Sequence, residues 1–194
     1  MASHGDHSPE FKKLREKHRH FYLSVYTSTD ALVNHYICGG GLDLGLNEQG
    51  IEDARKLTHR FQKNPLKIKK IITAPELRTI QLADFFHDEL RGKILIFSEF
   101  KDQFMGDLEG KIITQNIDDL NPPHGESHAN FSSRVHNGLV RVLQENDLSL
   151  VIAHPRVAKK IFDWIGLEEE TVEAGVLYSI DLPVGSGNAH FRQV

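Results

Sequence analysis

The chain has 194 residues, of which 39% are hydrophobic, and its formal net charge is -4 at neutral pH. This length can bury one hydrophobic core, so we expect a single domain over residues 1–194. The charges are interspersed without a basic stripe, which argues against a nucleic-acid partner. No apolar run approaches the roughly 18 residues of a membrane span, and the first residues lack the apolar core of a signal peptide. We therefore expect a cytoplasmic protein without a membrane partner.

Cysteine and histidine usage bears on metal binding. Cys38 is the only cysteine, so the sequence predicts neither an internal disulfide nor a thiolate metal site. Four histidines, His4, His7, His18 and His20, lie in the first twenty residues. Their spacing could chelate a metal, but we favour the interpretation of a solvated lead-in. We expect no metal and no other cofactor.

The first half of the chain alternates between extended and helical patterns. Residues 1–20 form an expected helical lead-in, because Ser8, Pro9 and Glu10 read as the start of a helix that runs to about Lys17. The β-branched and aromatic stretch 21–26 predicts a strand, and a glycine-rich loop at 39–41 follows it. Asn47 then caps a helix whose apolar positions share one face.

The second half continues the alternation. Strands are expected within KIKKIIT (67–73), KILIFSE (93–99), DLSLVIA (147–153) and GVLYSIDLP (175–183). Helices are expected to begin at Pro75, after a cap at Ser127, and at Pro155, the last ending at Gly166. A long loop runs from about Glu99 to Glu126. The order predicts an α/β fold, a three-layer α/β/α sandwich with a mainly parallel central sheet.

Ligands of such folds bind beyond the carboxyl ends of the strands, so the residues there are the candidates for chemistry. Arg78 lies early in a helix and can bind a phosphate or carboxylate with two nitrogens. His154 follows an apolar strand directly. Glu99 and Asp102 follow another strand, and either could act as a general acid if burial raises its pKa.

Five motifs in sequence order resemble the landmarks of the histidine phosphatase superfamily, phosphoglycerate mutase-like branch. They are LGLNEQG (44–50), TAPELRTIQLA (73–83), GDLEGK (106–111), HGES (124–127) with Arg134 after it, and VIAH (151–154). The resemblance covers about residues 21–183 and implies a phosphoglycerate mutase-like fold. It also implies phosphoryl transfer through a histidine of an Arg-His-Gly motif after the first strand.

Carried over residue by residue, the resemblance makes Arg78 a phosphate clamp and His154 the second histidine. Asp102 matches the acid that protonates the leaving group, and Glu99 is the alternative acid. The Arg-His-Gly motif is degenerate, because the ungapped first strand puts Val25 at the arginine, Tyr26 at the nucleophilic histidine and Thr27 at the glycine. Pro155 also lacks a backbone N–H beside the phosphate position.

Three functions are compatible with this sequence. A catalytically impaired protein could bind a phosphorylated small molecule, a phosphoprotein or another anion at Arg78 and His154. An active phosphomonoesterase could use a non-standard nucleophile, although Tyr26 needs strong activation and Arg19-His20 lies before the strand. His35 could fold back over the site. A relic pocket on a protein-interaction scaffold is the third possibility. The sequence does not indicate an oligomeric state.

Overall fold

The computed structural model describes residues 13–63, 65–114, 116–144, 148–167, 171–185 and 187–194. The described residues form a six-stranded sheet with the strand order β3-β2-β4-β1-β5-β6. Its strands are β1 (Arg19–Val25), β2 (Lys70–Thr73), β3 (Lys93–Ile96), β4 (Ser149–Ala153), β5 (Leu177–Leu182) and β6 (His190–Gln193). The first four pair in parallel, whereas β5 and β6 pair antiparallel. The expected mainly parallel sheet is confirmed.

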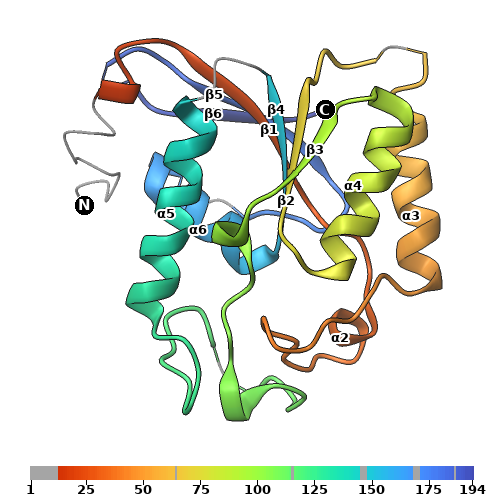
Figure 1. Ribbon diagram of the computed structural model, residues 1–194, viewed down its shortest axis with the longest axis vertical. Helices are drawn as coiled ribbons and strands as arrows, with labels where there is room; N and C mark the ends of the chain where they lie inside the picture. Colours follow the sequence, from red (N-terminus) through yellow and green to blue (C-terminus); the bar gives the residue numbers. More distant parts are fainter. Residues whose placement is uncertain (1–12, 64, 115, 145–147, 168–170, 186) are drawn as a thin grey trace.

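Helices cover both faces of this sheet. They are α2 (Asp30–Val33), α3 (Glu48–His59), α4 (Leu77–Leu90), α5 (His128–Gln144) and α6 (Pro155–Ile165), with 3₁₀ turns η1 (Ser98–Phe100) and η2 (Gly106–Leu108). Figure 1 shows α3 and α4 on one side of the sheet and α5 and α6 on the other. The three-layer α/β/α arrangement predicted from the alternating patterns is therefore confirmed.

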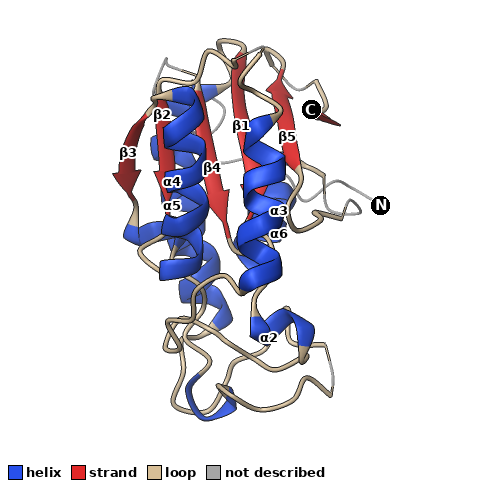
Figure 2. Cartoon of the chain, turned by 90° about the vertical axis from the view of Figure 1, so that its right-hand side faces the viewer, coloured by secondary structure: helices blue, strands red, loops and turns tan. Residues whose placement is uncertain are grey.

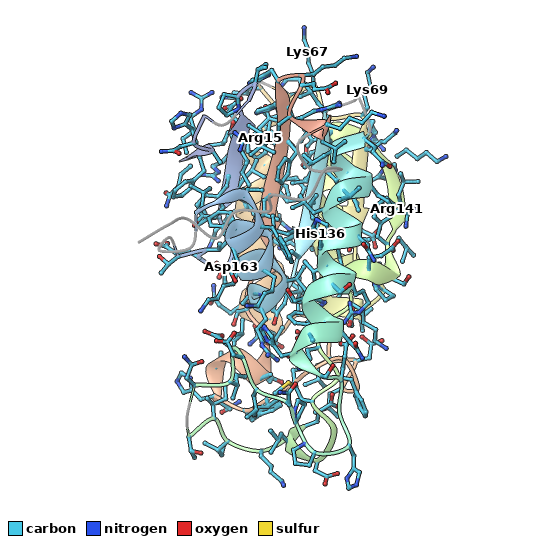
Figure 3. All side chains as sticks on the ribbon, turned by 90° about the vertical axis from the view of Figure 1, so that its left-hand side faces the viewer. Arg15, Lys67, Lys69, His136, Arg141 and Asp163 are labelled. Carbon is cyan, nitrogen blue, oxygen red and sulfur yellow. The ribbon has the colours of Figure 1, made fainter. Side chains whose placement is uncertain are left out.

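Local sequence explains these elements. All five residues of β4 are buried, as expected of a central strand covered on both faces. The Asn47 side chain accepts a hydrogen bond from the N–H of Gly50 and so caps α3. Gly166 ends α6 in the left-handed conformation, which glycine adopts without steric cost. Between α5 and α6, the ring of His136 packs on Trp164 at 4.4 Å between centroids (Figure 3).

Some predicted boundaries are wrong. The helix expected to begin at Pro75 begins at Leu77, because Glu76 keeps an extended backbone as its N-cap residue. The short helix α2 and the strand β6 were not predicted. The lead-in helix expected from Ser8, with His4 and His7, falls mostly outside the described residues.

The parallel strands all end at one edge of the sheet. In Figure 2 the arrowheads of β3 and β4 point toward the end of the molecule where α2 and the long loops gather. The residues that follow β1, β2 and β4 are therefore brought together there. None of the helices in the described residues combines the length and apolar content that a membrane crossing needs.

Candidate functional site

Tyr26 lies at the carboxyl end of β1, one residue beyond the strand. Its backbone N–H donates to the carbonyl of Ala153 at 3.4 Å, which continues the pairing with β4. Its side chain is only 4% exposed. The preceding residue, Val25, is fully buried in the hydrophobic core, and Thr27 donates its hydroxyl to the carbonyl of Gly50 at 2.7 Å. The strand end is thus tightly packed at the position of the degenerate motif.

Arg78, in the first turn of α4, has no exposed surface. Its two terminal nitrogens donate to the carbonyls of Gly39 and Leu42 at 3.0 and 3.1 Å. The guanidinium carbon lies 5.4 Å from the centre of the Tyr26 ring, within the range of a cation–π contact. The head group of Arg78 is therefore directed inward, where carbonyl groups of the glycine-rich loop surround it.

Close approach explains why glycines occupy this loop. Gly39 has a φ of +60°, a conformation that side-chain-bearing residues rarely adopt. A Cβ atom on Gly40 would lie 2.6 Å from the carbonyl oxygen of Asp102. The loop therefore packs directly against the segment that carries the predicted acid.

His154 ends β4 and is fully buried. Its Nε2 donates to a carboxylate oxygen of Glu76 at 3.1 Å. The other Glu76 oxygen accepts the backbone N–H of Asp102 at 2.9 Å. Burial opposes ionisation of Glu76, but the hydrogen bond and charge of His154 outweigh it and lower the pKa of this carboxyl. Glu76 is therefore an ionised link between His154 and Asp102.

Sequence reasoning did not identify Glu76 as a site residue. The available signal was an acid three residues after the end of β2 and two residues before Arg78. Acids next to a helix start usually interact with the helix N-terminus, so this position gave no indication that the side chain would turn inward.

The Asp102 carboxylate lies between the buried side chains of Arg78 and His154. Its Oδ2 is 3.5 Å from a terminal nitrogen of Arg78 and 3.8 Å from Nδ1 of His154. Its Oδ1 accepts the N–H of Gln103 at 2.9 Å. Arg78 and His154 therefore face a common point at which Asp102 already supplies negative charge.

Arg134 of α5 fixes the loop that carries Asp102. It donates to the carbonyls of Glu99 and Lys101 at 2.9 and 2.8 Å, and it binds Glu126 with two nitrogens at 3.0 and 2.6 Å. Such bidentate pairs are geometrically specific. Arg134 therefore holds the loop in place, and its side chain does not contact the side chains of Arg78 or His154.

Glu99, the alternative acid, is held elsewhere. Its carboxylate pairs with Arg141 (labelled on α5 in Figure 3). Burial opposes ionisation, but hydrogen bonds and the charge of Arg141 lower the pKa of Glu99. The structure therefore brings Tyr26, Arg78, Asp102 and His154 together and leaves Glu99 outside this group.

The environment of Tyr26 opposes its use as a nucleophile. Burial raises the pKa of its phenol well above the usual range, and the charge of Asp102 raises it further, whereas Arg78 opposes the shift only in part. Its ring also meets the His154 ring edge-on at 5.5 Å between centroids. Tyr26 is thus a neutral packing partner of both Arg78 and His154.

A cavity of about 240 Å³ opens in front of this group. Tyr26, Asp102 and His35 line it, whereas the fully buried side chains of Arg78 and His154 do not. The backbone carbonyl of His35 accepts a hydrogen bond from the N–H of Ile113 at 2.8 Å. Among the described residues, no three His, Cys, Asp or Glu side chains form a group that could hold a metal ion.

Comparisons with known proteins agree with this architecture. The family model described as histidine phosphatase superfamily (branch 1) matches residues 28–174. The match begins just after Thr27, the last residue of the degenerate motif. No curated protein sequence matches the chain.

Solved structures with the same fold include three bacterial proteins. A candidate alpha-ribazole-5'-P phosphatase from Escherichia coli is 21% identical with a TM-score of 0.76, covering 90% of this chain and 95% of that one. Phosphoglycerate mutase from Thermus thermophilus is 20% identical with a TM-score of 0.72, covering 91% of this chain and 99% of that one. YhfR of Bacillus stearothermophilus is 19% identical with a TM-score of 0.73, covering 90% of this chain and 95% of that one. The fold is therefore phosphoglycerate mutase-like. The family model matches residues 28–174, which are most of this chain, so the chain belongs to the histidine phosphatase superfamily.

Proposed function

We propose that this protein has lost the phosphohistidine chemistry of its superfamily and uses the centre at Arg78 and His154 to bind a phosphorylated or other anionic ligand. The observation that carries the proposal is the buried ring of Tyr26, packed against both Arg78 and His154. The superfamily resemblance places the nucleophilic histidine at this position. A phenol whose pKa is raised by burial remains protonated at neutral pH and is a poor nucleophile.

Unpartnered buried atoms favour a binding site over a relic pocket. Within the part of the chain that the structure describes, Nε of Arg78 and Nδ1 of His154 are buried without a hydrogen-bond partner. Leaving a buried polar group unsatisfied costs about 1–3 kcal/mol, and such groups in a native protein call for an explanation such as a missing ion. A bound anion beside these side chains would offer an acceptor to the Nε–H of Arg78.

In the absence of ligand, Asp102 serves as the internal counter-ion. Its carboxylate neutralises Arg78 at 3.5 Å and faces His154 at 3.8 Å. Asp102 also lines the cavity, so a ligand would enter from that side. An incoming phosphate must therefore displace this carboxylate or bind with it protonated, and the affinity of the native protein for phosphate should be weak.

The substitution Asp102→Asn tests this arrangement. It leaves Arg78 without its nearby carboxylate, and breaking such a buried pair costs roughly 3–5 kcal/mol. Inorganic phosphate can then replace the missing charge. We expect a lower melting temperature without phosphate, a larger phosphate-induced rise than in the wild type, and tighter phosphate binding by calorimetry. Glu99→Gln, which removes a carboxylate outside the centre, should leave phosphate binding unchanged.

The outcomes separate the alternatives. A relic pocket predicts that phosphate stabilises neither the wild type nor Asp102→Asn. Equal phosphate responses in Asp102→Asn and Glu99→Gln would also contradict the proposal, because binding would then be independent of the buried centre.

A further inference from the structure

The wall of the 240 Å³ cavity is largely apolar. The large side chains that contribute to this apolar lining include Leu32, Tyr36, Ile37, Met105, Ile113 and Ile117. Pockets for drug-sized ligands measure roughly 300–1,000 Å³, so this cavity fits a smaller molecule. A sugar or glycerol body would leave its hydroxyl groups against this wall without partners, at a cost in free energy.

The apolar wall extends to the surface. Ile113 is 42% exposed, and its neighbour Ile112, which does not line the cavity, is 60% exposed. Both lie on the segment that pairs with residues 35–37, where Ile112 is bridged to Tyr36. Ile112 and Ile113 are therefore a matched pair of exposed isoleucines, of which only Ile113 contacts the cavity.

A second cation lies on the cavity wall. Arg156, at the second position of α6, lines the cavity. Within the described residues it has no carboxylate at ion-pair distance. One terminal nitrogen donates to the carbonyls of Ile117 and Asp118 at 2.7 and 3.2 Å and contacts Gln103.

The other terminal nitrogen of Arg156 is less engaged. It contacts the sulfur of Met105 at 2.8 Å, and sulfur is a weak acceptor. Each terminal nitrogen carries two hydrogens, so one N–H of this nitrogen remains for a ligand. Arg156 can therefore attract an anion into the cavity and hydrogen-bond to it.

We infer that the ligand is a small organic phosphate or phosphonate whose body is apolar, with its ring or branched chain against Ile37 and Ile113. Its anionic group lies near Arg156 and displaces the Asp102 carboxylate from Arg78 and His154. This inference rests on the proposed function, because it names the class of anion that the same site takes. It adds that the apolar body, and not the phosphate alone, determines affinity.

The test compares three probes by calorimetry with the full chain: phenylphosphonate, glycerol 3-phosphate and inorganic phosphate. Phenylphosphonate should bind about tenfold more tightly than either of the others, because only its ring buries apolar surface. Ile113→Asn should weaken phenylphosphonate binding about fivefold without changing phosphate binding. Ile112→Asn is the matched control and should bind all three like the wild type. Arg156→Gln should weaken all three, by about tenfold.

Two results would overturn the inference while leaving the proposed function standing. One is equal affinity for all three probes. The other is an equal loss of phenylphosphonate binding in Ile112→Asn and Ile113→Asn, since the cavity wall would then not be the contact. Failure of the proposed function looks different, because no probe would bind and Asp102→Asn would not respond to phosphate. An unchanged affinity of folded Arg156→Gln for every probe would contradict the placement of the anionic group.

Discussion

The edge-on contact between Tyr26 and His154, with ring centroids 5.5 Å apart and planes at 72°, joins the ends of β1 and β4. The resemblance to this superfamily implies that the positions of Tyr26 and His154 correspond to two histidines that contact one phosphoryl group. In this chain the first of these positions holds the phenol ring of Tyr26, and burial raises the pKa of its hydroxyl so that it stays protonated. The proposed function holds that recognition of an anion survives that exchange and that covalent transfer through a histidine does not.

Restoring the missing groups tests this interpretation. The double substitution Val25→Arg with Tyr26→His should raise hydrolysis of an aryl phosphate at least about tenfold above the wild type, since each lost clamp can cost a factor of 10²–10³. Tyr26→His alone should recover less. Both variants should form acid-labile, base-stable phosphorylated protein, which is trapped by quenching and detected with labelled phosphate ester.

Core packing limits the gain. Val25 is fully buried, so an arginine there should lower the melting temperature, and Thr27 and Pro155 remain as departures from the motif. The Tyr26→His variant also changes a buried core residue but leaves Val25 in place, so it serves as the reference for the effect of the arginine on stability. If the double variant folds and binds phosphate but shows neither turnover nor trapped phosphate, the alignment of Tyr26 with the nucleophile is wrong.

Glu76 should contribute pH-dependent stability. Its folded-state pKa lies below the ordinary value of 4.5, so its stabilising contribution is present above that value and is lost as pH falls through the folded pKa. Glu76→Gln should lower the free energy of unfolding by about 1–3 kcal/mol at neutral pH. Urea titrations of both proteins at a series of pH values should give free energies of unfolding that converge as the pH falls through the folded-state pKa of Glu76. A constant difference at all pH values would contradict the assigned role.

Much of the fold could be predicted because its signals are local. The apolar run that ends at His154 predicts a buried strand, and Asn47 and Gly166 mark helix ends by their own side-chain and backbone preferences. The strand β6 carries no such signal, since none of its residues is buried and it lies on the sheet edge. The four-residue helix α2 is too short to show a periodic pattern.

The site could be predicted only in part, because its geometry depends on contacts between distant segments. Arg78 and Asp102 are recognisable from motif position, but their pairing depends on how the glycine-rich loop folds. Glu76 and Arg156 were missed because acids and arginines in a first helical turn are commonly exposed charges. Both are directed inward by partners distant in sequence, namely His154 and the loop that contains Met105.

Hydrolysis of para-nitrophenyl phosphate by the wild-type protein tests the central claim most directly. Arg78→Ala and Asp102→Asn serve as comparison variants, because any catalysis at this site requires the clamp and the acid, whereas activity from a contaminating phosphatase would persist in both. The account predicts that all three proteins release product at or near the background rate. Turnover by the wild type well above background that is abolished in Arg78→Ala and reduced in Asp102→Asn would contradict it.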